Sequence, residues 1–187
     1  MHNHHEAVGG LRWLFVLPLV PILMVLAIGA AVSVDGDIPA RISEASAVVT
    51  LEYENTADRL YPDEPQRLPP GTTINVPAGG QVQVSMLGDG SGVITIDGPA
   101  VWTYVEGSYR GTLVQRMTNR TRDHTVVIRQ ISGRAHYDFG NTEPGFDEIH
   151  FQLEVPNGTR RPLSPCWDLI VDGTGARLLT VECPNQE

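Results

Sequence analysis

The stretch TINVPAGGQVQVSML, residues 73–87, alternates apolar and polar side chains on both sides of a short Pro-Ala-Gly-Gly bend. Its apolar residues recur at every second position, which is the period of a β-strand with one buried face. The stretch therefore predicts strands over 73–76 and 81–87, joined by a bend at 77–80.

The next stretch, GDGSGVITIDGP (88–99), has alternating glycines that resemble a phosphate-binding loop. Such a loop opens a helix, whose first amides hold the anion. Here the glycines precede β-branched, alternating residues instead, which favours a hairpin turn. We expect a second turn at Asp97-Gly98, with Pro99 ending one strand before the next.

The same period of two continues to the end of the chain, with Gly, Pro, Asn or Asp about every ten residues. Further strands are expected over 92–96, 100–107, 112–119, 124–131, 134–139, 148–155, 167–171 and 177–182. No segment after residue 34 has a sustained helical period. The prediction is an all-β domain over 71–187, an antiparallel β-sandwich, a barrel or a short β-solenoid.

Residues 35–70 differ from this domain in composition. SAVVTLEYE (46–54) predicts one strand, but YPDEPQRLPPG (61–71) holds four prolines and residues 35–64 are strongly acidic. We expect an extracytoplasmic entry segment or linker that stays largely solvated.

The N-terminal part contains an uncharged stretch, WLFVLPLVPILMVLAIGAAV, at 13–32. As a helix these residues would reach ~30 Å, the thickness of a bilayer core. The expectation is a transmembrane helix over 11–34, with residues 1–10 in the cytoplasm because Arg12 precedes the span and acids follow it. A signal peptide cleaved near AVS (31–33) is the alternative.

The charge balance bears on partners. The formal net charge is -9, and all 13 basic residues are arginine. An acidic chain without lysine is a poor candidate for binding nucleic acid or anionic membranes. No motif in the sequence indicates a cofactor.

The two cysteines, Cys166 and Cys183, flank the predicted hairpin WDLIVDGTGARLLTVE. An even count in an exported segment favours a disulfide, with a zinc or redox role as the alternative. If Asp172 lies opposite Arg177 across a four-residue GTGA loop, Cys166 lies opposite Cys183. The same register would then pair the opposite charges and the sulfurs.

Two sets of residues are candidates for function. The first is a partner-binding set, made of a basic group and two aromatic residues: Arg110, Arg116, Arg120, Arg122, Trp102 and Tyr104. The basic group could instead balance acidic segments of the same domain, and the aromatics could belong to the core. The second set consists of pairs of histidine and carboxylate: Asp123 with His124, His136 with Asp138, and Glu148 with His150. Such pairs can polarise an imidazole or bind a metal. Solvated strand faces are the plainer interpretation, since no nucleophile motif accompanies them.

The chain contains LPPGTTINVPAGGQVQVSML followed by GVITIDGPA, then ISGRAHYDF, and a closing stretch from FQLEV to LLTVE. Together these stretches, over about residues 68–183, resemble the FecR-type extracytoplasmic domain family. The resemblance implies an all-β domain that binds proteins or surface components without chemistry. The family's signalling members carry a cytoplasmic sigma-regulating domain, for which ten residues are too short. We therefore expect a membrane-anchored, non-enzymatic domain with a protein partner in the membrane or cell envelope. An exported enzyme, or a metal- or carbohydrate-binding protein using the histidine–carboxylate pairs, is the alternative.

Overall fold

The computed structural model describes residues 33–62, 64–87, 91–112, 123–142 and 145–183. The chain divides into two compact units, and the larger holds residues 35–110 and 121–187. The smaller unit, 1–34 and 111–120, includes few described residues, namely the first two of β1 and the last two of β8. In the described residues the larger unit is all-β apart from one short 3₁₀ turn, which confirms the predicted class.

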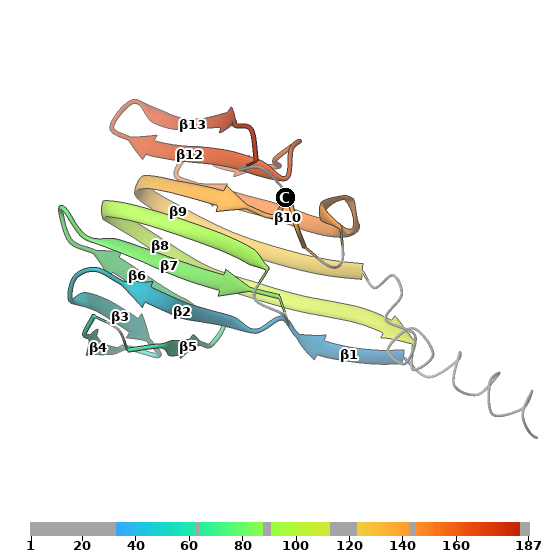
Figure 1. The fold of residues 1–187 in the computed structure, drawn as a ribbon, viewed down its shortest axis with the longest axis horizontal. Helices are drawn as coiled ribbons and strands as arrows, with labels where there is room; N and C mark the ends of the chain where they lie inside the picture. Colours follow the sequence, from blue (N-terminus) through green and yellow to red (C-terminus); the bar gives the residue numbers. More distant parts are fainter. Residues whose placement is uncertain (1–32, 63, 88–90, 113–122, 143–144, 184–187) are drawn as a thin grey trace, which may run out of the picture. The chain divides into compact units, whose positions relative to one another are not determined.

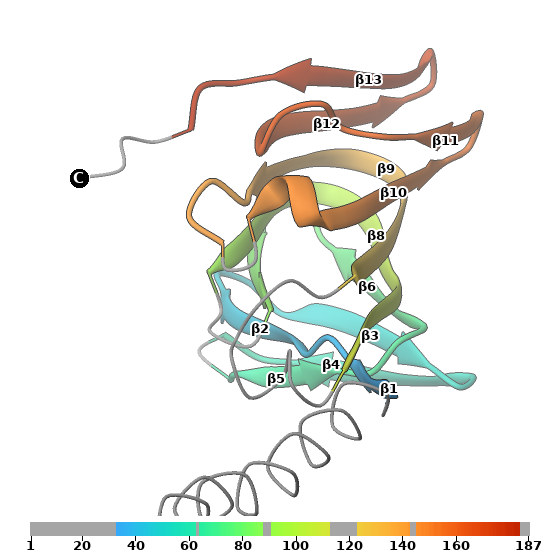
Figure 2. The same cartoon turned by 90° about the vertical axis from the view of Figure 1, so that its right-hand side faces the viewer.

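The strands are numbered in chain order, and Figures 1 and 2 together label them. Their bounds are β1 (Ser33–Asp37), β2 (Ala40–Ala45), β3 (Val49–Tyr53), β4 (Thr56–Leu60), β5 (Gln66–Leu68), β6 (Thr72–Val76), β7 (Gln81–Met86), β8 (Gly92–Thr112), β9 (Asp123–Asp138), β10 (Ile149–Val155), β11 (Gly158–Arg160), β12 (Cys166–Asp172) and β13 (Gly175–Thr180), with the 3₁₀ turn η1 (Phe146–Glu148) before β10. Most of the strand expected at 112–119 lies outside the described residues.

Two long strands, β8 and β9, run beside each other and connect two halves of one sheet. The first half has the order β5-β2-β7-β8-β9-β12-β13 and uses β8 up to residue 97 and β9 from residue 133. The second half has the order β4-β3-β6-β8-β9-β10-β11 and uses the other parts of both strands. The pairs in these two orders are antiparallel except β9 with β10, which is parallel. Figure 2 shows how strongly β8 and β9 curve along their length.

The Asp97-Gly98 step, predicted as a turn between two strands, is instead a bend inside β8. Asp97 still pairs with Gln81 of β7, and Ala100 already pairs with Val76 of β6. Because β6 and β7 are joined by a tight connection, β8 must bend where it passes from one to the other. The two strands expected at 124–131 and 134–139 are likewise one bent strand, β9.

The glycine-rich stretch 88–92 joins two neighbouring antiparallel strands, as predicted. β7 pairs with β8, with Met86 opposite Gly92. Residues 88–90 themselves lie outside the described residues.

The segment 35–70, which we expected to stay solvated, belongs to the packed body. It supplies β2 to β5 and the described part of β1 from residue 35 on. Ile42, Val49 and Leu68 from this segment are at most 2% exposed. The described prolines and acids of this segment lie in connections and on outward faces, while alternate apolar residues reach the core.

The hairpin of β12 and β13 has a shorter loop than we predicted. Asp172 lies opposite Gly175, so the loop holds two residues rather than four. The Asp172 carboxylate accepts hydrogen bonds from the backbone N–H of Thr174, at 2.8 Å, and from its hydroxyl, at 2.5 Å, which closes the turn early. Arg177 still binds Asp172 at 2.8 Å, from a diagonal position.

The core joins apolar side chains from both sheet halves. At its centre, a chain of hydrogen bonds links the indole N–H of Trp102 to Tyr137 at 3.2 Å and the Tyr137 hydroxyl to Gln130 at 3.1 Å. The Gln130 amide then donates to the carbonyls of Gly133 and Leu169, at 2.9 and 3.1 Å. Gln130, only 1% exposed, thereby hydrogen-bonds to the backbone of both β9 and β12 and has partners for its own buried amide.

Candidate functional site

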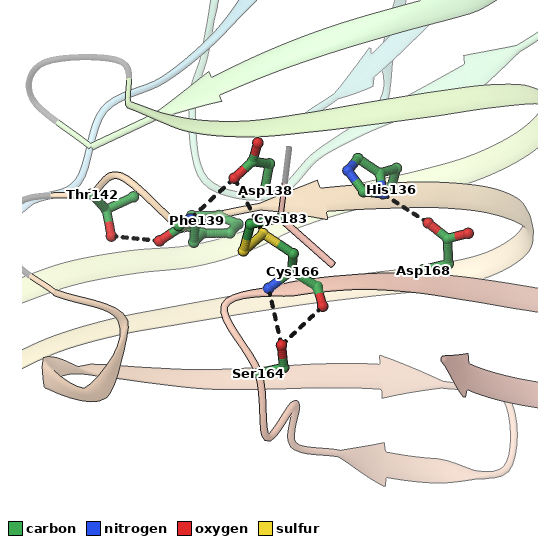
Figure 3. Close-up of a disulfide and its surroundings, with 9 residues drawn as sticks. His136, Asp138, Phe139, Thr142, Ser164, Cys166, Asp168 and Cys183 are labelled. Atoms are coloured by element: carbon green, nitrogen blue, oxygen red, sulfur yellow. Dashed lines mark hydrogen bonds and ion pairs between the residues drawn. A yellow bond between two sulfur atoms is a disulfide. The ribbon is translucent and has the colours of Figure 1, made fainter. Parts of the chain in front are cut away.

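A polar cluster beside the disulfide forms the candidate site (Figure 3). Its side chains come from β9 and β12, on the sheet face opposite the core. Because side chains alternate along a strand, buried Ala135 and Tyr137 leave the residues between them on the outer face. The pairing of β9 with β12 then sets His136 opposite Asp168 and Asp138 opposite Cys166.

Asp168 is the centre of this cluster. One carboxylate oxygen binds His136 Nδ1 at 2.8 Å and the other accepts a hydrogen bond from Arg134 at 2.5 Å. The Asp168 side chain is 8% exposed, whereas that of Arg134 is 56% exposed. Burial by itself would raise the pKa of Asp168, but the hydrogen bonds from His136 and Arg134 outweigh it and hold the pKa below its usual value.

Asp138 lies against the disulfide. It accepts a hydrogen bond from the backbone N–H of Gly140 at 3.0 Å, and Cys166 Sγ lies 3.4 Å from the same oxygen. The ligand atoms of Asp138, Cys166 and Cys183 lie within 4.8 Å of one another, as in a metal site. Because the two sulfurs are bonded to each other, neither is a thiolate that could bind a metal.

The disulfide between Cys166 and Cys183 is present as predicted, with 5.3 Å between the Cα atoms. The predicted register was wrong, since Cys183 does not lie opposite Cys166. The backbone N–H of Val181 donates to the Cys166 carbonyl, so Cys183 lies two residues beyond the paired position. The chain after β13 brings the sulfur back to Cys166.

Two residues of the predicted partner-binding set belong to the core. Trp102 and Tyr104 are fully buried, so neither can form an exposed binding face. They lie on the inward face of β8, and the Tyr104 hydroxyl donates to the carbonyl of Ile38 at 2.5 Å. This contact joins the N-terminal segment of the body to β8.

The basic residues of that set are mostly outside the described part. Arg116, Arg120 and Arg122 fall in 113–122. Arg110, near the end of β8, is 77% exposed and lies 3.6 Å from Asp35. The structure therefore brings only Arg110 of the predicted set to a described surface.

The histidine–carboxylate pairs are arranged differently from the prediction. His136 binds Asp168 of another strand rather than its near neighbour Asp138. His124 is buried, at 7% exposure, while His150 is exposed on β10 and Glu148 lies in η1. Asp168 and Arg134 were not predicted to act together, because only the strand register places them side by side.

The cluster is suited to hydrogen bonding at a surface more than to bond making. Asp168 already neutralises Arg134 and orients the His136 ring, and Thr95 of β8 lies opposite His136 on the same face. No family model, curated protein or solved structure matches the chain. In the part of the chain that the structure describes, no helix is long and apolar enough to cross a membrane. The stretch expected to do so, 13–32, lies outside that part.

Replacing Asp168 with asparagine should lower stability at neutral pH by about 1.5 kcal/mol, because two charge-assisted hydrogen bonds are lost. A carboxyl group whose folded pKa is depressed stabilises the fold above its unfolded pKa of about 4 and loses that contribution as pH falls through the folded value. The deficit of Asp168→Asn relative to wild type should therefore shrink below pH 4. Urea unfolding of the full chain from pH 7 to pH 3 measures this. The matched control is Asp147→Asn, at an exposed position, and an equal deficit at every pH would contradict the account.

Proposed function

We propose that this chain is a membrane-anchored protein whose all-β body works outside the cytoplasm as a non-catalytic protein-interaction domain, in envelope sensing or signalling. In this proposal the anchor is the expected span 11–34, the last two residues of which belong to strand β1 in the structure. Residues 1–10 stay in the cytoplasm, and the body is a FecR-like β-sandwich or short β-solenoid. The partner is a protein of the membrane or cell envelope.

The observation that carries the proposal is the disulfide between Cys166 and Cys183. Structural disulfides form and persist in oxidising compartments and are rare in the cytosol. The uncharged stretch 13–32 supplies a means of export and attachment that agrees with this location.

Two features support a binding role over an enzymatic one. In the described cluster the carboxylate that binds His136 is that of Asp168, which also pairs with Arg134. Arg134 therefore already neutralises this carboxylate. In the described residues the printed hydrogen bond of the His136 ring goes to the Asp168 carboxylate, and not to a hydroxyl or thiol that the ring could activate as a nucleophile.

The proposed topology predicts a definite labelling pattern. We would introduce Tyr61→Cys, at a position 54% exposed in the body, or His4→Cys, in the N-terminal stretch, while the native cysteines stay in their disulfide. A membrane-impermeant maleimide on bacterial cells with a permeabilised outer membrane should label Tyr61→Cys. It should label His4→Cys only after the inner membrane is lysed.

The opposite pattern would reject the proposal. Protection of Tyr61→Cys until lysis would place the body in the cytoplasm. Recovery of the uncut chain in the soluble fraction would reject the anchor.

A further inference from the structure

The strands at the margins of the sheet differ in how they are protected against pairing with another chain. An exposed sheet edge offers unpaired backbone groups, and proteins usually cover it with charge, proline or short length. β5 and β11 have three residues each, and prolines flank β5. β4 carries Asp58 and Arg59, and β1 carries Asp35 and Asp37. These four strands are therefore poor templates for a further strand.

β13 lacks such protection in the described structure. It has six residues, GARLLT, without proline or acid, and it pairs only with β12. Its one charged side chain, Arg177, is already neutralised by Asp172 at 2.8 Å. Because the charges of Arg177 and Asp172 cancel, the edge carries no net charge that would select a partner of opposite charge.

The hydrogen-bonding direction of β13 follows from one contact. The N–H of Val181 donates to the Cys166 carbonyl, at 3.2 Å, so the backbone of Val181 points toward β12. Because direction alternates along a strand, the backbones of Leu179 and Arg177 also point toward β12. Those of Ala176, Leu178 and Thr180 point away from β12, to an edge that no described strand covers.

The side chains of β13 add an apolar feature to this edge. Leu179 is 48% exposed, while Ala176 and Leu178 pack against the core from the other face. The disulfide fastens the chain just beyond β13, because Cys183 follows the strand by three residues. The edge is therefore held in an extended form before any partner arrives, which lowers the entropic cost of pairing.

We propose that β13 pairs with β13 of a second copy of this chain, antiparallel and with Leu179 opposite Leu179 of the second copy. In this register Leu179 is a non-hydrogen-bonded pair, with Cα atoms about 4.5 Å apart, so the two exposed leucines cover each other. Leu178 then lies opposite Thr180 of the second copy, and their outward backbone groups bond.

The neighbouring two-fold registers are disfavoured. One about Arg177 sets two guanidinium groups opposite each other, and one about Leu178 sets exposed Leu179 opposite the charged Arg177 of the second copy. The proposal goes beyond the proposed function and does not depend on which side of a membrane the body occupies. Its test uses purified protein, so its failure would leave the topology experiment unaffected.

The test is residue-specific cross-linking of the full chain in detergent. Because about 4.5 Å between Cα atoms suits a disulfide, Leu179→Cys should give a covalent dimer on mild oxidation. Ala57→Cys, exposed on the edge strand β4, is the matched control and should stay monomeric. Peptide mapping checks that Cys166 remains bonded to Cys183.

A second variant tests the non-covalent dimer. Leu179→Lys sets two ammonium groups opposite each other. In sedimentation experiments it should raise the dissociation constant of the dimer at least tenfold. Ala57→Lys, the control, should leave that constant unchanged. Circular dichroism shows that each variant is folded. Equal cross-linking of Leu179→Cys and Ala57→Cys, a dimer unaffected by Leu179→Lys, or capture of a different protein by Leu179→Cys in cells would each overturn the proposal.

Discussion

Replacing Gly133 with alanine should destabilise the body by about 4 kcal/mol or more, which is at the upper end of single-substitution effects. Gly133 has a φ of +91°, a conformation that side chains with a Cβ rarely adopt. An added Cβ would also lie 2.6 Å from the Pro99 carbonyl oxygen and 2.7 Å from the Ala100 Cα. Both are backbone atoms of β8, which cannot move aside without opening the bend that the two strands share.

Two other glycines separate the causes of this loss. Gly158 also has a positive φ, +121°, but nothing lies within 4 Å of an added Cβ, so Gly158→Ala measures backbone strain alone. At Gly173 nothing lies within 4 Å of an added Cβ, and φ is not in the positive range. Gly173→Ala should therefore change the free energy of unfolding little. Urea unfolding of the full chain should rank the losses as Gly133, then Gly158, then Gly173. A Gly133→Ala variant as stable as Gly173→Ala would show that β8 and β9 do not meet as described.

Removing the disulfide should have the second largest effect. The bond closes a loop with a sequence separation of 17 residues, and a loop of this size contributes about 3 kcal/mol, mainly by restricting the unfolded chain. The double variant Cys166→Ala, Cys183→Ala should therefore lose about 3 kcal/mol while keeping its β-type circular dichroism, because β12 remains paired with β9.

Chemical reduction of the wild type is the matched control for this variant. It should produce the same loss, and should have no effect on the variant itself. A loss below about 1 kcal/mol in both cases would show that the bond does not constrain the unfolded chain in the expected way.

The sequence predicted the strands well because the alternation is local. Ile74 and Val82 are buried at the positions that the period of two requires. The bends in β8 and β9 were not predictable in this way. A Gly-Pro or Ser-Gly step has the same composition whether it ends a strand or bends it, and only the neighbouring strands decide. The buried parts of 35–70 were missed for a similar reason, since composition averaged over a segment hides its alternate apolar residues.

The candidate site was predicted less completely than the fold. The disulfide followed from cysteine count and position, although its register was wrong by two residues. The cluster of Arg134, His136 and Asp168 depends on which strands are neighbours, and β9 pairs with a strand about thirty residues further along the chain. Trp102 and Tyr104 were open to either interpretation, because alternation on a bent strand does not say which face is covered.

We propose that this β body folds outside the cytoplasm, where the bond between Cys166 and Cys183 persists. The most direct measurement traps thiols in living cells with a membrane-permeant alkylating agent at the moment of harvest. Mass spectrometry of the intact chain then counts the alkylated cysteines. We predict that both cysteines escape alkylation and become reactive only after reduction. Two alkylated cysteines on the folded chain would contradict the account.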